Sequence, residues 1–421
     1  MSTAIDNLRK RLGPLGWGAL AMFAVFRFGD VLNLLYKVFL GRALPALDFG
    51  AIDPLMGVLA VLSLPVAVIF QVAMKSISRL HGMGREAECR ALLRDLVRVA
   101  VIGMVVTVAG VYLLEQYVLT RLHLESPVYL HLTALLLAVG WWQPLYGAIQ
   151  QGALRYRIVA ISSFLNPALT LVLTFTFVAV ASWGLPGALL ARALGTVATT
   201  ALLAVLLRGF FAGEKRAYRD EFRLMAAMVC PMGIYLISMT LLFQFDRLLV
   251  RNFLLQESGG YGALVTVGSI PTYFLGPIVF VLFPLAASEH AAGRDLKRFY
   301  SQALAIGLGV TAVCVLAFSL FGGWLLNAWN PAFGPFARYL WPYALAMGLH
   351  GTIDILASVE LARHRYGFLW LLAAPVAIMC AALYVWRAQL GIAGIVWVLV
   401  AARAAILFCL WAYGERAESR P

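Results

Sequence analysis

Apolar residues run along the chain in long blocks, and short polar or charged stretches separate one block from the next. Each block is about 20 residues long, the length that an α-helix needs to cross a hydrocarbon core of about 30 Å. We therefore predict an all-α polytopic membrane protein with about twelve transmembrane helices. The second helix is expected to begin at Asp53-Pro54, an N-cap followed by proline at the first helical position. The predicted spans lie near residues 16–40, 51–74, 97–118, 129–152, 158–182, 186–208, 225–250, 262–287, 301–322, 336–360, 367–386 and 394–413.

The composition supports a membrane protein. Hydrophobic residues make up 62% of the chain and charged residues 13%, whereas a soluble domain carries about twice that charge. The first apolar block is too long for a signal peptide and further blocks follow it, so we interpret it as the first span. The five cysteines show no paired spacing and are expected to be packing residues. The sequence has no Walker lysine loop, HExxH motif or cysteine cluster, so we expect no metal, no cofactor and no enzymatic activity.

The net charge of +13 follows the loops. Lys and Arg are concentrated before the first span and in two later loops, at Arg9, Lys10, Arg11, Lys75, Arg79, Arg85, Arg90, Arg94, Arg98, Lys215, Arg216, Arg219 and Arg223. The alternate loops are poor in them, with Arg121 alone between the third and fourth spans. By the positive-inside rule both termini are predicted to be cytoplasmic. The basic loops then set topology and are not expected to bind nucleic acid.

A polar stretch divides the chain into two halves. We predict an N-terminal lobe over 1–208, a cytoplasmic linker over 209–224, and a C-terminal lobe with a short tail over 225–421. Because an even number of crossings returns the chain to its starting side, the lobes are expected to form a parallel pseudo-twofold repeat of six-helix bundles around a central cavity. Short echoes agree with this: Phe49-Gly50-Ala51 with Tyr261-Gly262-Ala263, and Gly84-Arg85-Glu86 with Gly293-Arg294-Asp295.

Charged side chains inside the first and seventh spans are the strongest functional indication. A charge at the centre of a lipid-facing helix costs about 2.5–3.5 kcal/mol on insertion scales, so such residues normally face protein or an aqueous cavity. Helical spacing groups them into two polar faces, Arg27, Asp30, Asn33 and Lys37 on the first span and Thr240, Gln244, Arg247 and Arg251 on the seventh. Asp246 lies about 100° around the helix from Arg247. It is therefore expected to bond a neighbouring helix or Arg27.

Several of these charges have a purely structural alternative. Arg27 and Asp30 could neutralise each other within one helix. Lys37 and Arg251 could extend along the helix to the membrane surface. Arg247 has no acidic residue three or four positions away, so a place in the cavity is its favoured interpretation.

The sixth, tenth and twelfth spans add further polar candidates. His350 and Asp354 are four residues apart and could share a proton, which makes them candidates for ion coupling. Their alternative is a hydrogen bond between helices without a transport role. Arg192 and Arg403 are expected to line the cavity or to pair with Asp354 or Asp30.

Short motifs in both halves resemble one family of transporters. The relevant stretches are Phe245-Asp246-Arg247-Leu248-Leu249-Val250, Gly259-Gly260-Tyr261-Gly262, Phe283-Pro284-Leu285-Ala286, Leu40-Gly41-Arg42-Ala43-Leu44 and Asp48-Phe49-Gly50. They are similar to the polysaccharide exporters of the multidrug/oligosaccharidyl-lipid/polysaccharide (MOP) superfamily, especially the O-antigen (Wzx-type) flippases of lipopolysaccharide synthesis. With about twelve spans in two lobes, the resemblance covers essentially the whole chain.

The resemblance implies a multi-pass transporter of the bacterial inner membrane. It would move a polyprenyl-pyrophosphate-linked oligosaccharide from the cytoplasmic to the periplasmic leaflet by alternating access, with membrane lipids and other polysaccharide assembly proteins as partners. The expected headgroup-binding residues are Arg27, Arg247, Arg192, Arg403, Gln244, Lys37 and Arg251. H+ or Na+ is the expected coupling ion, with Asp30, Asp246, His350 and Asp354 as its candidate ligands.

Other functions fit the same sequence less well. A multidrug antiporter of the same superfamily should have a cavity that favours acidic and aromatic residues, whereas the charges within these spans lean basic. A lipid II flippase would have two further spans. A polysaccharide polymerase or glycosyltransferase should carry a sizeable catalytic loop, and a passive scaffold would not require charges inside the spans.

Overall fold

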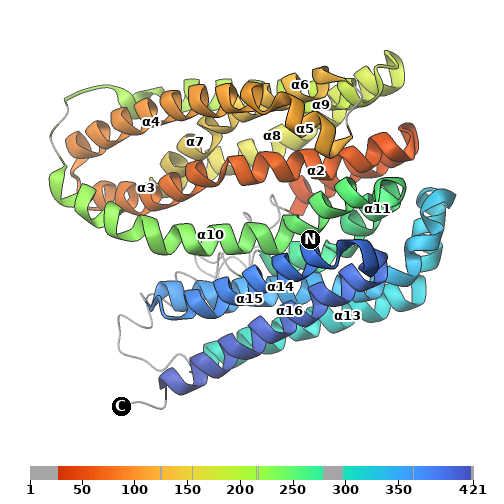
Figure 1. Cartoon of the computed structure of the whole chain (residues 1–421). Coiled ribbons are helices and arrows are strands. Elements are labelled where there is room, and N and C mark those ends of the chain that lie inside the picture. Colours follow the sequence, from red (N-terminus) through yellow and green to blue (C-terminus); the bar gives the residue numbers. More distant parts are fainter. Residues whose placement is uncertain are drawn as a thin grey trace, which may run out of the picture. The chain divides into compact units, whose positions relative to one another are not determined.

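The computed structural model describes residues 27–123, 126–153, 155–214, 216, 218–276, 278, 297–363 and 365–418. Helices make up most of these residues, which include no strand (Figure 1). The prediction of an all-α polytopic membrane protein is confirmed.

The helices follow one another with short connections. In chain order they are residues 27–43, α2 (Ala46–Leu62), α3 (Leu64–Gly82), α4 (Glu86–Leu113), α5 (Glu115–Leu122), α6 (Pro127–Gly140), α7 (Trp142–Gly152), α8 (Tyr156–Thr174), α9 (Gly184–Leu207), α10 (Arg219–Phe253), α11 (Ser258–Gly268), residues 270–276, α13 (Lys297–Trp329), α14 (Leu340–Ala362), α15 (Phe368–Val385) and α16 (Arg387–Glu418). Short π- and 3₁₀-helical segments extend α8, α9 and α14.

Nine helical segments of the described chain are long and apolar enough to cross a membrane. They coincide with the predicted third to seventh and ninth to twelfth spans. The second predicted span corresponds to α2 and α3, which qualify together as one broken span. The spans predicted near 16–40 and 262–287 lie partly outside the described residues, so the count of twelve stays a prediction.

The predicted start of the second span at Asp53 was wrong. The helix α2 begins at Ala46, and Pro54 lies inside it. A proline is tolerated within a membrane helix because neighbouring groups can satisfy the backbone that it leaves unbonded. The local Asp-Pro pattern therefore did not mark a helix end, and Asp53 is a buried residue of α2 instead of an exposed cap.

The chain forms two compact units that do not follow chain order. Unit 1 contains the described parts of Met1–Phe39, Leu62–Gln116 and Ser126–Met232. Unit 2 contains those of Leu40–Val61, Tyr117–Glu125 and Gly233–Pro421. Nearly all of α2 thus belongs with the C-terminal helices, and α10 contributes to both units. The predicted lobes 1–208 and 225–421, as a parallel repeat, remain a prediction.

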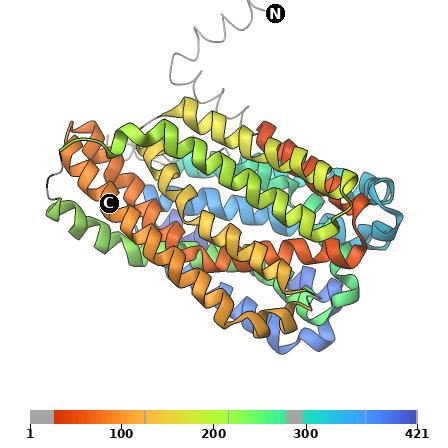
Figure 2. The same ribbon diagram turned by 90° about the horizontal axis from the view of Figure 1, so that it is seen from above.

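Unit 1 packs around α3, α4, α7 and α9. Its apolar core includes Phe70, Leu93, Trp141 and Leu203. The indole of Trp141 lies directly on Gly103 of α4, where a Cβ would come within 2.3 Å of ring atoms, and its Nε1 donates to Thr107 Oγ1 at 2.9 Å. The helices α8 and α9 run side by side in the same unit (Figure 1 and Figure 2).

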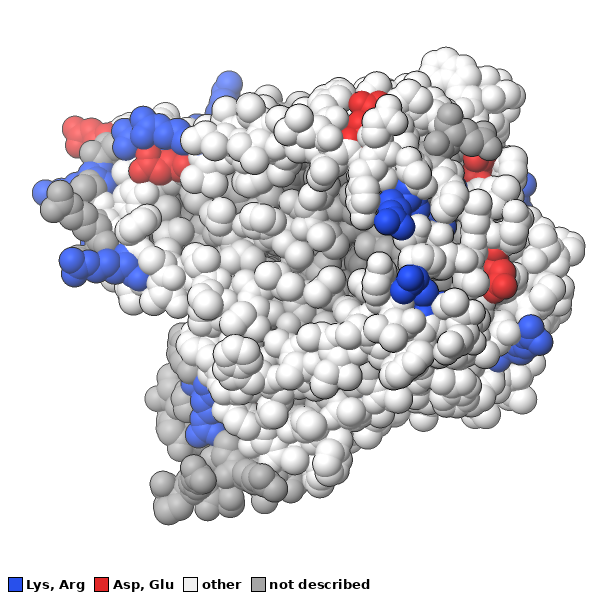
Figure 3. Space-filling view, in the orientation of Figure 1, with Lys and Arg blue, Asp and Glu red and all other residues white. Residues whose placement is uncertain are grey.

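Charged residues are sparse on the face shown in Figure 3. Large apolar side chains are exposed on the long helices, including Leu113 at 86% and Trp324 at 72%. Such side chains suit contact with lipid. In unit 1 the charges concentrate where α3 ends and α4 begins, and they pair locally, as Arg85 does with Glu88 at 2.8 Å. The predicted basic loop between the second and third spans is therefore mainly two helix ends joined by a turn.

Unit 2 is organised around α14, which packs against α11, α13 and α16. Glycines allow close approach at these contacts, as Gly348 of α14 does against Thr311 of α13. A glycine also allows α2 to pack closely against α11. A Cβ on Gly50 would lie 2.4 Å from Ser258 Oγ and 2.6 Å from the Gly259 nitrogen. This contact brings the first turns of α2 to the residues that follow α10.

The Gly50 contact predicts a specific loss of stability. Replacing Gly50 by Leu should lower the free energy of unfolding by about 1–3 kcal/mol, because the added side chain has no room against α11. Thermal unfolding of the purified protein in detergent measures this. The matched control is Gly110→Leu in α4, where a Cβ meets nothing within 4 Å. Equal melting temperatures for the two variants would contradict the assigned packing.

Candidate functional site

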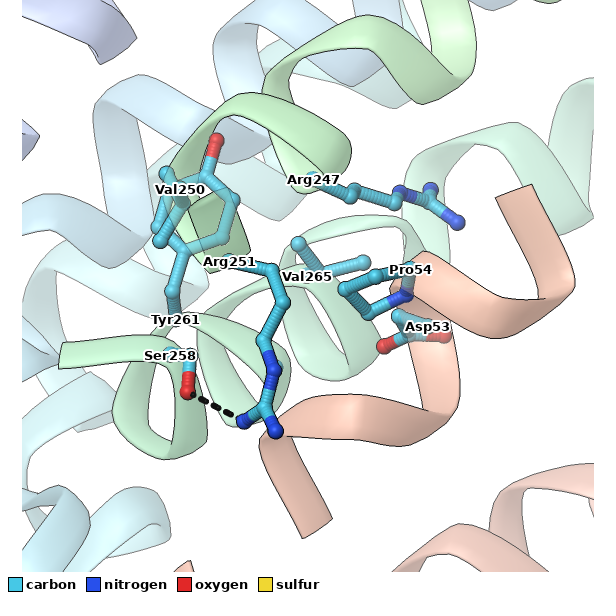
Figure 4. A pocket seen from close by; sticks show the side chains of 10 residues that line it. Asp53, Pro54, Arg247, Val250, Arg251, Ser258, Tyr261 and Val265 are labelled. Atoms are coloured by element: carbon cyan, nitrogen blue, oxygen red, sulfur yellow. Dashed lines mark hydrogen bonds between the residues drawn. The ribbon is translucent and has the colours of Figure 1, made fainter. Parts of the chain in front are cut away.

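A small pocket in unit 2, with a volume of about 10 Å³, gathers charged residues from three helices. We call it the arginine pocket. Helix α10 supplies two arginines, α2 supplies an acid, and α11 supplies hydroxyl groups (Figure 4). Its lining residues are Gly50, Asp53, Pro54, Arg247, Val250, Arg251, Ser258, Tyr261, Gly262 and Val265.

Arg251 is held by protein oxygens. It is 5% exposed, and its Nη1 donates to the Leu47 carbonyl at 2.7 Å and to Ser258 Oγ at 3.2 Å. Its Nη2 donates to the His123 carbonyl at 3.3 Å. Figure 4 shows the side chain turned toward Ser258. Arg251 therefore connects α10 to the first turn of α2, to the residues after α5 and to the start of α11. It does not extend to the membrane surface, which was the structural alternative from the sequence.

Arg247 is buried without such ties. It is 7% exposed, its guanidinium carbon lies 4.2 Å from the centre of the Phe243 ring, and its Nε has no hydrogen-bond partner among the described residues. In Figure 4 the side chain extends toward α2, on the side of Pro54 and Asp53. The opposite charge of Asp53 in the same pocket favours the buried guanidinium. Arg247 is thus a buried cation with hydrogen-bond donors to spare.

Asp246 faces away from Arg247, as helical geometry predicted. Its carboxylate is fully buried and accepts hydrogen bonds from Tyr261 at 2.6 Å and Tyr343 at 3.2 Å. The two tyrosine rings meet edge to face at 5.9 Å. Of the two partners expected for Asp246, the neighbouring helix is therefore present, through α11 and α14.

Arg403 of α16 is also fully buried. It donates from Nη2 to the Leu242 carbonyl of α10, one helical turn before Asp246. Its Nε and Nη1 have no hydrogen-bond partner among the described residues. Arg403 contributes positive charge beside the Asp246 carboxylate, and no hydrogen bond to Asp354 is formed within the described chain.

A second, larger cavity lies in unit 2 along an earlier part of α10. We call it the polar cavity. It has a volume of about 380 Å³, and its walls come from α10, α14, residues 270–276 and the end of α2. The lining residues are Ala60, Tyr235, Leu236, Met239, Thr240, Phe243, Gln244, Thr272, Gly276, His350, Gly351 and Asp354.

The polar cavity contains His350 and Asp354, but they do not bond to each other within the described structure. Asp354 accepts a hydrogen bond from Tyr235 instead. His350 packs its ring 5.3 Å from that of Phe243, and its Nδ1 has no partner among the described residues. The same is true of Gln244 Oε1. Two residues of the cavity wall therefore carry buried hydrogen-bonding atoms that have no partner among the described residues.

The remaining candidates belong to unit 1. Arg27 and Asp30 form an ion pair at 2.7 Å within one helix, which is the self-neutralising arrangement weighed from the sequence. The guanidinium of Arg192 lies 5.9 Å from the Tyr36 ring centre. Lys37 is half-buried on the same helix as Arg27.

Comparison with known proteins identifies the family. A sequence model of the family described as polysaccharide biosynthesis protein matches residues 16–290. The chain belongs to this family. It is thereby a member of the MOP superfamily of transporters and a multi-pass membrane protein. No curated protein sequence matches the chain.

Solved structures of MOP transporters share the fold of this family member. A multidrug resistance MATE family transporter in its inward-facing conformation aligns with a TM-score of 0.78 at 13% identity, over 95% of this chain and 98% of that one. The outward-facing conformation of such a transporter aligns with a TM-score of 0.67 at 14% identity, over 96% and 95%. A MOP superfamily transporter from Pyrococcus furiosus, described as having a binding pocket of reverse polarity, gives 0.61 at 15% identity, over 96% and 95%.

Some residues of the site were not predicted. Asp53 was interpreted as a helix cap, although its position within an apolar block was a sign of burial. Tyr261 lies in a motif of the family resemblance, but nothing local indicates that it binds Asp246. Tyr343, Phe243 and Tyr235 lie in apolar spans where an aromatic residue is ordinary, so the sequence offers no signal for them.

The Asp246 network predicts a loss of stability on removal of one hydroxyl. Tyr261→Phe keeps the ring but deletes a hydrogen bond to a buried carboxylate, which should cost about 1.5–3 kcal/mol. Thermal unfolding measures the change. Tyr117→Phe, at a site that is 61% exposed, is the control and should unfold like the parent. An unchanged melting temperature for Tyr261→Phe would refute the role given to this bond.

Proposed function

We propose that this chain is a flippase that moves a polyprenyl-pyrophosphate-linked oligosaccharide from the cytoplasmic to the periplasmic leaflet of a bacterial inner membrane. Arg247 carries the proposal. It is buried, forms no ion pair among the described residues, and keeps an unbonded Nε. A buried cation without a bonded anion is costly, and a phosphate oxygen would satisfy it. The family's description supports a saccharide as cargo.

The chemistry of the cargo explains why arginine is suitable. A pyrophosphate cannot cross hydrocarbon without compensation of its charge. A guanidinium can bind phosphate oxygens through two parallel hydrogen bonds, while the polyprenyl tail stays in the bilayer. Alternation of two lobes about the loaded site would then turn the headgroup outward.

The other predicted headgroup residues take different parts in this proposal. Arg251 and Arg403 donate to backbone oxygens, so they contribute positive charge and hold helices in place. Gln244 keeps an unbonded Oε1 and can accept a hydrogen bond from the headgroup. Arg27, Arg192 and Lys37 remain candidates on unit 1.

The balance of charge supports an anionic cargo over a cationic drug. Among the described residues in and beside the arginine pocket, the buried cations are Arg247, Arg251 and Arg403, and the buried acids are Asp53 and Asp246. A cation entering there would meet net repulsion. The Pyrococcus furiosus transporter, for which reverse polarity of the binding pocket suggests a different function, offers a parallel. A multidrug antiporter is therefore the weaker alternative. As a flippase, the protein would act together with other polysaccharide assembly proteins.

We include coupling to H+ or Na+ in the proposal. Asp30 is paired with Arg27, and Asp246 and Asp354 accept hydrogen bonds from tyrosines. His350 and Asp354 are the candidates for taking up a proton, because His350 Nδ1 has no partner among the described residues and a protonated Asp354 leaves the described cavity wall without an acidic charge. Flipping measured in vesicles with an imposed proton or sodium gradient tests this part. A rate that neither gradient changes would rule it out.

Replacement of Arg247 tests the flippase. In proteoliposomes loaded with a fluorescent polyprenyl-pyrophosphate-linked oligosaccharide, Arg247→Gln should lower the rate of headgroup exposure by about tenfold or more, because the lost charge-assisted bonds amount to about 1.4 kcal/mol or more. Arg247→Lys should retain part of the rate, since it keeps the charge but not the fork of donors.

Arg98→Gln is the matched control for that assay. This arginine is 66% exposed on α4, and its replacement should leave flipping near the parent rate. Protein abundance and melting temperature are measured for each variant. Undiminished flipping by Arg247→Gln would remove this residue from the mechanism.

A further inference from the structure

We propose that the polar cavity of unit 2 is a binding subsite for a sugar residue of the headgroup. The inference rests on the proposed function, because it concerns the same cargo. It assigns a neutral saccharide to a cavity that is distinct from the arginine pocket.

The size of the polar cavity suits one part of a saccharide. Its volume of about 380 Å³ lies at the lower end of the range of about 300–1,000 Å³ for small-molecule pockets. A sugar unit fits such a space, whereas a whole oligosaccharide does not. The cavity would therefore bind a single sugar residue of the glycan.

The hydrogen-bonding groups of the cavity match sugar hydroxyls. Gln244 Oε1 and His350 Nδ1 are buried and have no partner within the described residues. The His350 side chain as a whole is 9% exposed. The Asp354 carboxylate is oriented by the Tyr235 hydroxyl, which leaves acceptor capacity for a ligand. A hydroxyl both donates and accepts, so a sugar can satisfy an amide oxygen, a carboxylate and an imidazole together.

One wall of the cavity is apolar. Phe243, Leu236 and Met239 line it from α10. The C–H faces of a sugar ring can pack against such a wall while its hydroxyls reach the polar side, and a few placed polar groups within an apolar lining are typical of ligand sites.

The charges near the cavity favour a neutral ligand. Asp354 is the acid in its lining, and the guanidinium of Arg247 lies 4.2 Å from the ring centre of Phe243 in the same wall. The arginine already occupies a face of the ring that could attract an organic cation, and its charge opposes that of the carboxylate. A polar, uncharged ligand meets no net penalty there.

The cavity also lies where a sugar beside a phosphate would reach. Gln244 and Arg247 are three residues apart on α10, so their positions differ by about 4.5 Å along the helix axis. A phosphate at Arg247 would place the adjoining sugar near Gln244. The subsite would thus recognise the sugar attached to the pyrophosphate.

Saturation-transfer NMR on the full chain in nanodiscs tests the subsite. The probes are the methyl α-glycosides of glucose, galactose, N-acetylglucosamine and N-acetylgalactosamine. At least one should bind, and Asp354→Asn and Gln244→Leu should each weaken it by about fivefold or more, since each removes an acceptor. Ser319→Ala, on an exposed part of α13, should bind as the parent does.

A separate titration with inorganic pyrophosphate distinguishes the subsite from the proposed function. Pyrophosphate binding that does not depend on Arg247, together with sugar binding that depends on Asp354 and Gln244, would overturn the headgroup role of Arg247 and support the subsite. Absence of sugar binding, or sugar binding that both cavity variants retain in full, would overturn the subsite alone. Displacement of the sugar by tetraphenylphosphonium, with loss of that cation's binding in Asp354→Asn, would also overturn it in favour of a cation site.

Discussion

A carboxylate in the middle of an apolar helix bundle needs hydrogen-bond donors from its neighbours, and in unit 2 two tyrosines provide them to Asp246. These bonds join α10 to α11 and α14 and so fix the rotation of α10 about its axis. With Asp246 held on one side, Arg247 must project about 100° away, toward α2. The placement of Arg247 therefore depends on the two hydrogen bonds to Asp246 Oδ2. Asp246 Oδ1 has no hydrogen-bond partner among the described residues.

Close packing through glycine gives α2 its part in the same arrangement. The first turns of α2 approach α11 at Gly50 and Gly259, and Arg251 secures them through the Leu47 carbonyl. Asp53 consequently lines a pocket with a residue that is almost 200 positions away in the chain. Arg247 and Arg251 of α10 thus differ, because Arg251 donates to groups of the fold whereas Arg247 Nε has no hydrogen-bond partner among the described residues.

The sequence predicted correctly those features that depend on the geometry of a single helix. Long apolar runs located the spans, and the period of the helix separated Asp246 from Arg247 and grouped Arg247 with Gln244. The bonds from Arg251 to Leu47 and His123 could not be predicted, because these partners are backbone carbonyls from distant segments. Asp53 was misread for the same reason: the Asp-Pro pair is a local signal for a helix start, whereas packing of α2 on α11 decides its actual place. The bond between Tyr235 and Asp354 likewise depends on helices that only the fold brings together.

The central claim is that Arg247 binds the pyrophosphate group of a lipid-linked cargo. Native mass spectrometry of the purified chain titrated with polyprenyl pyrophosphate measures this directly. The parent and Arg121→Gln should bind the lipid alike, and Arg247→Gln should bind it at least about tenfold more weakly, as the loss of charge-assisted hydrogen bonds implies. Equal affinity of the parent and Arg247→Gln would contradict the account.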